Sequence, residues 1–415
     1  MQELLNWARR LVYPAAMCLL LWAGWQVLAS PFVFDSSGKI IAVYDGDLTV
    51  QDCTEAAHMT PDKENISEQA LGGFCAAWRA LPKARPEVDL LNVHNEKDDR
   101  VESKTTKMYQ QLASRVALGP VAGVISLLTS PDSPPVVRFC RTMQIPLLLA
   151  VAANDDLMAP AEDTSGLVFR MMPTNGRQAE DMAAWLDQQV HGRQLRVAIF
   201  HEPNTFGEFL QRQLNHVLLP KTRSKEITLF NFEVTEQLEF ADLMPQLWCE
   251  KLDIIVYLGF ASRAMDLLNK LRWYKADADQ VTCPSKDISR SFNTLTILLS
   301  SGAYNEELND REKYEFPFAV FAMLPTQPAA MKAAKLSRQG ASQDEEETAA
   351  SEYGYDSYAL LEILAAQKFK IPSQPLGSSK TGHDYHFDKD GELMPAEKNH
   401  YQAYLLASSP PERKQ

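Results

Sequence analysis

The chain is 415 residues long, with 45% apolar and 23% charged residues and a formal net charge of −13 at pH 7. This length favours two domains over a single core, and the composition is that of a folded protein rather than a disordered or fibrous one. The excess of negative charge argues against nucleic acid or an anionic membrane surface as a partner.

The first 30 residues have the composition of an export signal. Arg9 and Arg10 precede an apolar run of 18 residues, and Ala29 offers a small residue for cleavage. The same run is near the lower length limit for a membrane span. We therefore expect residues 1–30 to be either a cleaved export signal or a retained anchor, which would hold the protein to the inner membrane through residues 11–29. In both cases the rest of the chain is expected to be exported, to the periplasm or another extracytoplasmic space.

After this segment, short apolar runs alternate with stretches whose apolar residues recur every three or four positions. The first predicted strands are Ile40–Tyr44, Val88–Val93, Val121–Ser126 and Ile145–Val151, with helices between them. Strands that are apolar throughout and separated by helices are typical of a parallel sheet covered on both faces. This part of the chain is therefore predicted to form a doubly wound α/β lobe.

The same alternation starts again after Arg170. Strands are predicted at Leu195–Phe200, Ile227–Phe232, Ile254–Gly259, Thr294–Leu299 and Phe318–Leu324. This repetition predicts a second, similar lobe with its own parallel sheet. Near the end of the chain, a turn around Asp388–Gly391 predicts a hairpin between Tyr385–Phe387 and Tyr401–Leu406.

Small and polar residues follow two strands of the first predicted lobe. Thr129 and Ser130 come after the third strand, and Ala152, Ala153 and Asn154 come after the fourth. In an open α/β sheet, the carboxyl ends of the strands form the crevice in which ligands bind. These residues are therefore candidate ligand contacts, although Thr129 and Ser130 would also serve as a helix cap without any ligand.

Common catalytic patterns are missing from the sequence. It contains no GxGxxG, GxxxxGK[ST], GxSxG or HExxH motif, the patterns that mark nucleotide sites, serine nucleophiles and catalytic zinc. We therefore predict neither an enzyme nor a cofactor or metal ion.

Four cysteines are spaced for local disulfides. In an oxidising compartment we expect Cys53 to pair with Cys75, and Cys249 with Cys283. Cys140 lies on the apolar face of a helical stretch and is expected to be a free core residue. The alternative, that all of them are reduced core residues, stays open at this point.

Seven segments, in order, carry a resemblance to a known family. They are VAGVISLLTSP, IPLLLAVAANDDL, FRMMPTNGRQAEDMAAWL, VAIFHEPNTFGEFLQRQL, DIIVYLGFASRAMDLLNKLR, YGYDSYALLEIL and FDKDGEL. In this order and spacing the chain resembles the type I periplasmic substrate-binding proteins, in particular the leucine/isoleucine/valine-binding branch, which is also similar to the ligand-binding regions of animal receptors.

The resemblance implies two α/β lobes joined by three crossovers, with a ligand in the cleft between them and hinge closure on binding. The crossovers are expected near Met172-Pro173, Leu324-Pro325 and Thr381-Gly382. Lobe I would then comprise residues 38–172 plus 328–379, and lobe II residues 173–327 plus 380–408.

The resemblance also implies ligand positions. Thr129 or Ser130 would supply the hydroxyl of the third-strand loop, and Ala152 matches a family alanine. Ala153 stands where the family has a threonine hydroxyl, which puts a free α-amino acid in question. In the second lobe, Phe206 and Phe260 occupy the aromatic positions, and Asp45 or Asp47 would replace a missing family acid.

The function implied by the resemblance is capture of a small molecule, an amino-acid-like compound being one candidate, for an ABC-type transporter. The partner would then be a membrane permease. The alternative is a membrane-tethered ligand sensor, or a protein-interaction module with a degenerate site. Nucleic acid is expected in neither case.

Overall fold

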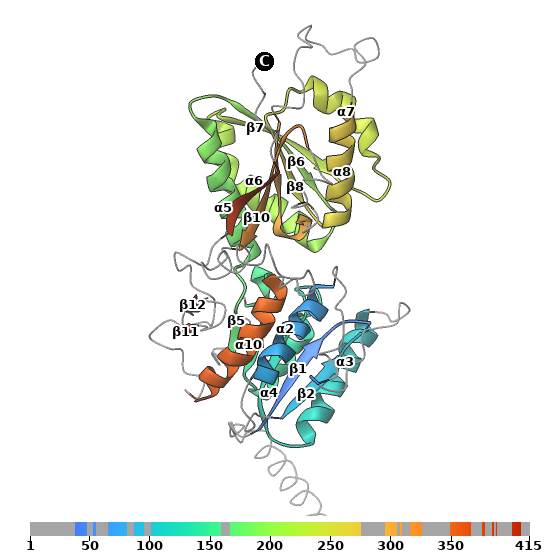
Figure 1. The fold of residues 1–415 in the computed structure, drawn as a ribbon, viewed down its shortest axis with the longest axis vertical. Helices are drawn as coiled ribbons and strands as arrows, with labels where there is room; N and C mark the ends of the chain where they lie inside the picture. Colours follow the sequence, from blue (N-terminus) through green and yellow to red (C-terminus); the bar gives the residue numbers. More distant parts are fainter. Residues whose placement is uncertain are drawn as a thin grey trace, which may run out of the picture.

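The computed structural model describes residues 38–47, 53–54, 65–80, 87–94, 101–158, 167–274, 295–304, 308, 316–325, 349–366, 376–377, 384–385, 387 and 401–407. These residues form two α/β lobes, each built on its own sheet (Figure 1). We call the lobe around the five-stranded sheet lobe I and the lobe around the six-stranded sheet lobe II. The predicted fold class, two doubly wound parallel-sheet lobes, is confirmed.

Lobe I contains five parallel strands in the spatial order β2-β1-β3-β4-β5. The strands are β1 (Lys39–Tyr44), β2 (Val88–Asn92), β3 (Val121–Ser126), β4 (Leu147–Leu149) and β5 (Val168–Arg170). The helices are α2 (Ile66–Ala80), α3 (Val101–Ala117), α4 (Pro134–Met143), the 3-10 turn η2 (Asp155–Leu157) and α10 (Ala349–Ala366). All residues of β3 are buried, which explains why this strand reads as an unbroken apolar run.

Helices cover both faces of the lobe I sheet. On one face, α2 and α10 lie side by side (Figure 1). Phe74, Tyr358 and Leu361 of these helices are buried in the core on this face. On the other face, α3 and α4 bury Leu112 and Val136. Because the apolar side chains of each strand alternate between the two faces, the sheet is shielded from water on both sides.

Lobe II repeats this arrangement, in the strand order β13-β10-β9-β8-β6-β7. The strands are β6 (Leu195–His201), β7 (Ile227–Glu233), β8 (Ile254–Leu258), β9 (Thr296–Leu299), β10 (Ala319–Pro325) and β13 (Tyr401–Ala407), of which β13 alone runs antiparallel to its neighbour. Helices α5 (Asn175–Val190) and α6 (Thr205–Arg223) cover one face. Helices α7 (Phe240–Cys249) and α8 (Ala261–Trp273) cover the other, and the 3-10 turn η4 (Ser301–Ala303) follows β9.

The chain passes between the lobes three times. It leaves lobe I after β5, returns from lobe II after β10, and leaves lobe I again before β13. The third passage lies later than we expected, because Tyr385 and Phe387 are buried in the core of lobe I. It therefore falls between Phe387 and Tyr401 and not at Thr381-Gly382.

The hairpin prediction near the C-terminus is wrong. Tyr385 lies in β12 (Asp384–Tyr385), which pairs with β11 (Leu376–Gly377), whereas β13 pairs with β10 in lobe II. The apolar run of β13 instead completes the lobe II sheet. The turn residues Asp388–Gly391 are compatible with a hairpin. The partner of β13 is nevertheless the distant strand β10.

The cysteines follow the expected pattern where they are described. Cys53 and Cys75 form a disulfide with a Cα–Cα distance of 4.9 Å, and Cys140 is free and buried. Cys249 is also disulfide-bonded. Cys283, its expected partner, lies outside the described residues.

The predicted export signal or anchor, residues 1–30, also lies outside the described residues. Among the helices that are described, none is both long and apolar enough to cross a bilayer.

Gly354 permits the close approach of α10 to α2. A β-carbon at this position would overlap the backbone carbonyl oxygen of Ala70 in α2. We expect Gly354→Ala to lower the free energy of unfolding by about 1–3 kcal/mol, the usual cost of over-packing. This exceeds the gain of roughly 0.5–1 kcal/mol that alanine has over glycine within a helix. Urea denaturation measures the difference.

The matched control is Gly119→Ala, because a β-carbon at Gly119 meets nothing within 4 Å. If Gly354→Ala and Gly119→Ala unfold at the same urea concentration, the two helices do not depend on this close contact.

Candidate functional site

The strand order reverses once in each of the two large sheets, and each reversal marks one edge at which a site can form. In lobe I the strand order reverses between β1 and β3, and in lobe II it reverses between β6 and β8. Helices leave to opposite faces at such a point, so a crevice opens at the carboxyl ends of those two strands. The residues that follow β1, β3, β6 and β8 therefore form the candidate site.

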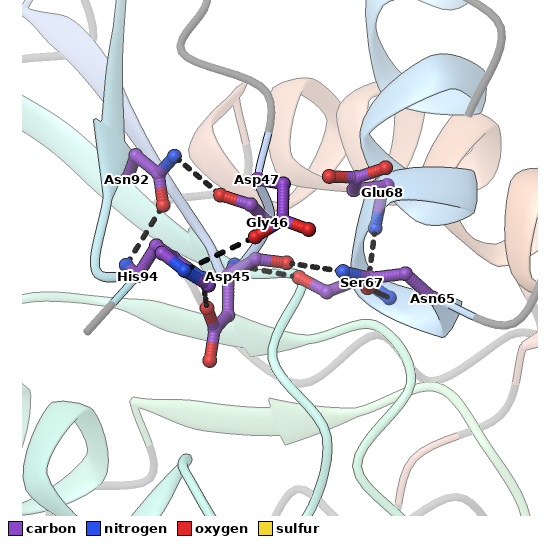
Figure 2. Close-up of polar contacts among 8 residues, drawn as sticks. All are labelled: Asp45, Gly46, Asp47, Asn65, Ser67, Glu68, Asn92 and His94. Carbon is purple, nitrogen blue, oxygen red and sulfur yellow. Dashed lines mark hydrogen bonds and ion pairs between the residues drawn. The ribbon is translucent and has the colours of Figure 1, made fainter. Parts of the chain in front are cut away.

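After β1, the loop of Asp45, Gly46 and Asp47 is tied to the neighbouring elements (Figure 2). The Asp45 N–H donates to Ser67 Oγ (2.8 Å), and Asn92 Nδ2, at the end of β2, donates to the Gly46 carbonyl (2.8 Å). Asn65 caps α2 by accepting from the Ser67 and Glu68 N–H groups. Side chains from α2 and β2 thus hold this loop in one backbone conformation.

His94 lies between the two aspartates of this loop (Figure 2). Its Nδ1 is 3.1 Å from Asp45 Oδ1, and its Nε2 is 3.1 Å from Asp47 Oδ1. A neutral imidazole carries one N–H, so both contacts are hydrogen bonds only when the ring is protonated. His94 is 44% exposed and Asp47 is 87% exposed, so the aspartate that we predicted as a ligand residue is accessible.

Ser130, after β3, joins the third-strand loop to the fourth. Its Oγ accepts from the backbone N–H groups of Ala153 (2.9 Å) and Asn154 (3.0 Å). Ser130, Ala153 and Asn154 were predicted as ligand residues, and the structure brings them together. The hydroxyl oxygen of Ser130 thus accepts from two backbone groups of its own chain.

The other predicted residues of lobe I are placed differently. Ala152 is fully buried in the core of lobe I. Thr129 is half-buried, and its carbonyl accepts from Ser133 Oγ (2.9 Å). Asn154 Oδ1 accepts from the Asp156 N–H (3.0 Å) and so caps η2.

The loop after β4 also joins lobe I to lobe II. The Ala153 carbonyl accepts from the N–H of Asn175 (2.8 Å), the first residue of α5, and Asp155 Oδ2 accepts from the Gly176 N–H (2.9 Å). A carboxylate at a helix N-terminus interacts favourably with the helix dipole. The first crossover is therefore held by hydrogen bonds as well as by the covalent chain.

In lobe II, Glu202 organises the candidate site. It follows β6, is nearly buried, and accepts from the Tyr257 hydroxyl (2.7 Å), the Phe260 N–H (2.7 Å) and Asn204 Nδ2 (2.9 Å). Gly259 leaves room for the carboxylate, because a β-carbon there would overlap it. Burial and the neighbouring Glu202 carboxylate raise the pKa of Tyr257, so this hydroxyl remains a donor at neutral pH.

Phe206 and Phe260 form a stacked pair, with ring centroids 5.7 Å apart and planes at 25°. Phe206 is half-buried at the start of α6, whereas Phe260 is 45% exposed at the cap of α8. The structure thus brings together the two aromatic residues predicted for lobe II. An exposed ring supported by a second ring is a surface on which a ligand can stack.

Within the described residues, no group of three or more His, Cys, Asp or Glu side chains is arranged to hold a metal ion. Burial raises the pKa of the Cys140 thiol well above its ordinary value, so this thiol is not a nucleophile at neutral pH.

Comparison with solved structures agrees with this geometry. A leucine-binding protein, LivK, from Thermotoga maritima matches with a TM-score of 0.59 at 14% identity, over 90% of this chain and 99% of that one. A LivJ substrate-binding protein from Streptococcus pneumoniae, in complex with isoleucine, matches with a TM-score of 0.56 at 13% identity, over 90% and 96% of the two chains. The chain has the fold of the type I periplasmic binding proteins.

A type I periplasmic binding protein from Bordetella pertussis gives a TM-score of 0.57 at 13% identity, over 90% and 98% of the two chains. These neighbours are substrate-binding proteins and not enzymes. No family model matches the sequence. No curated protein matches it either. The likeness is therefore one of fold.

Our sequence reasoning missed three residues of the candidate site. Asn92 ends β2 and His94 follows it, and the rule applied to the third and fourth strands would have identified them there too. Glu202 follows β6 in the same way. No motif marks these residues, so their position at the end of a strand is the one signal that the sequence carries.

Ser130→Ala is expected to lower the free energy of unfolding by about 1–3 kcal/mol, because two backbone N–H groups lose their acceptor. Ser114→Ala is the control, since Ser114 Oγ donates only to the exposed Gln110 carbonyl of its own helix (2.8 Å). The control should change stability by no more than about 0.5 kcal/mol. Equal denaturation midpoints for the two variants would show that the Ser130 bridge does not stabilise the fold.

Proposed function

We propose that the protein is an extracytoplasmic solute-binding protein that captures a small molecule between its two lobes for an ABC-type transporter. The observation that carries this proposal is that the strand order of each lobe reverses once. The predicted ligand residues Asp47, Thr129, Ser130, Phe206 and Phe260 follow the strands at these two reversals, and each has an exposed or half-buried side chain.

Each lobe contributes a different kind of surface in this proposal. Lobe I offers polar groups: the carboxylate of Asp47 and the loops of Thr129 and Asn154. Lobe II offers the stacked rings of Phe206 and Phe260. A ligand between them would contact charge on one side and aromatic surface on the other, a common composition for small-molecule sites.

The solved neighbours support this role by what their names state. LivK is named as a leucine-binding protein, and the LivJ structure contains isoleucine. Substrate capture by a two-lobed protein of this fold is therefore a function that the same architecture performs elsewhere. Fold alone does not transfer the ligand, so the proposal leaves the solute unnamed here.

Export is part of the proposal. The disulfide between Cys53 and Cys75 favours an oxidising compartment, and residues 1–30 have the composition of an export signal. The length of the apolar run favours a second candidate, a sensor tethered to the inner membrane. Fractionation of cells that produce the protein with and without residues 1–30 separates the two. Release of the full-length protein into the soluble periplasmic fraction would contradict the tethered form.

Binding is tested by a thermal-shift screen of the full-length protein against amino acids, amides, amines and aromatic acids. A ligand that binds only the native state raises the melting temperature, by an amount that grows with its concentration over Kd. We expect Phe260→Ala to reduce the shift by half or more at a fixed ligand concentration. Leu118→Ala is the control, because Leu118 is 76% exposed at the end of α3, before the amino end of β3.

An equal shift in the Phe260→Ala and Leu118→Ala variants would place the ligand away from the aromatic pair. A panel with no shift at all would contradict solute capture.

A further inference from the structure

We infer that the chain forms a homodimer through lobe II, in which the edge strand β7 pairs with β7 of a second copy in antiparallel orientation. The inference goes beyond the proposed function, because capture of a solute between two lobes needs one copy only. The observations that carry it are an uncharged strand edge, a hollow beside that edge, and two exposed opposite charges at the ends of the strand.

Strand β7 has one row of backbone groups that β6 does not use. Within the described residues, β7 is the last strand of the lobe II sheet and pairs with β6 alone. The Glu226 carbonyl accepts from the Leu195 N–H (2.9 Å), which turns the even-numbered residues of this stretch towards β6. The backbone groups of Leu229 and Asn231 therefore point away from β6, where they can bind another strand.

The edges of the lobe I sheet are protected against the addition of a strand. Strand β5 is only three residues long. Strand β2 carries Asp89, which is nearly buried and forms ion pairs with Lys39 (3.0 Å) and Arg115. Short edge strands and inward-pointing charges are devices that prevent pairing between chains. The β7 edge has neither device, because the stretch Ile227–Phe232 is longer and contains no charged residue.

An open hollow of about 410 Å³ lies between α6 and β7, beside this edge. Its walls include Leu219 of α6, which is 40% exposed, and Leu229 of β7. Asn215 also lines the hollow, and its side-chain oxygen is buried but accepts no hydrogen bond from the described residues. Exposed apolar groups and a buried acceptor without a donor both favour a surface that another chain covers.

A second copy of the same chain fits this edge in an antiparallel register. The backbone groups of the odd-numbered residues point outward, so they must face odd-numbered residues of the other strand. When Leu229 faces Leu229 of the second copy, Ile227 faces Asn231. These side chains lie on the face of the sheet that α6 covers, because successive side chains of a strand alternate between the faces. The two hollows then lie on the same side of the joined sheet.

The charges at the two ends of the strand favour this register. Lys225 lies two residues before β7, Glu233 is its last residue, and both are exposed. Neither has an ion-pair partner within the described part of the chain. In the proposed register Lys225 faces Glu233 of the second copy, and twofold symmetry forms this pair twice. The edge is thus complementary to itself, which favours a second copy over an unrelated protein.

Disulfide trapping tests the register, with the full-length protein purified after export. The two Leu229 positions face each other at a Cα–Cα distance of about 5.5 Å in such a pair, which a disulfide can span. We therefore expect Leu229→Cys to give a covalent dimer on mild oxidation, seen on a non-reducing gel. The two copies of Asn231→Cys would be roughly 13 Å apart along the strands, so this variant should stay monomeric on the gel.

Two further samples serve as controls for the trapping. Leu405→Cys places an exposed thiol on β13, the opposite edge of the same sheet. The wild-type protein reports on its own cysteines. Neither is expected to give the covalent dimer.

Charge reversal tests the contact without cysteines. Lys225→Glu should raise the dissociation constant of the dimer about tenfold, because two ion pairs become like-charge pairs. Glu233→Lys should have the same effect, and the double variant should restore the wild-type constant. Lys270→Glu is the matched control, since Lys270 is an exposed residue of α8. Sedimentation equilibrium measures the constants, and urea denaturation shows that each variant folds.

The outcomes separate the dimer from the proposed function. A wild-type protein that is monomeric at every concentration in the centrifuge overturns the inference. Equal trapping of Leu229→Cys and Leu405→Cys overturns it as well, and so does a double charge variant that dimerises no better than the single ones. A monomer that still gives a thermal shift with a solute leaves solute capture in place, whereas a dimer that binds no compound of the panel contradicts solute capture alone.

Discussion

The constraint on which the structure depends is the reversal of winding within each parallel sheet. Because β1 and β3 send their helices to opposite faces, the backbone at their carboxyl ends has no helix above it. The same holds for β6 and β8 in lobe II. These ends must satisfy their backbone groups with side chains from loops, and the residues that do this are the ones that shape the candidate site.

That requirement explains why so many polar residues at these edges point at their own chain. Asn65, Ser130, Asn204 and Glu202 each accept hydrogen bonds from backbone N–H groups that would otherwise stay unpaired. Leaving such a group buried without a partner costs about 1–3 kcal/mol. The loops therefore keep their conformation without a ligand. Only some of the polar groups in their sequence remain accessible for ligand binding.

The sequence predicted the sheets well because their physics is local. Strands such as Val121–Ser126 are buried on both faces, so their apolar runs are unbroken and easy to recognise. A predicted strand also defines which residues lie at its carboxyl end, so the positions of the candidate residues could be predicted together with the strands. The pairing of β13 with β10 did not follow, because a short run near a turn fits a hairpin and a distant sheet edge equally well.

The site was only partly predictable for a related reason. Residue type shows that Ser130 and Asn154 are polar, but not whether their oxygens face a ligand or a neighbouring N–H. His94 was overlooked because it lies outside the two strand ends that resemble the family segments, although it contacts Asp45 and Asp47 in space. Long-range contacts of this kind depend on the conformations of the loops, which the sequence alone does not define.

Ala153 lies where the family that this chain resembles has a threonine, and the hydrogen bonds of its loop bear on this difference. The side chain of Ala153 carries no hydrogen-bond acceptor of its own. With alanine there, Ser130 accepts from both N–H groups and the loop closes on itself. A site that shares its fold with leucine-binding proteins can therefore differ from them in the polar groups that it leaves accessible. The fold defines where the two lobes present their strand ends, and a few side-chain oxygens decide which groups remain free there.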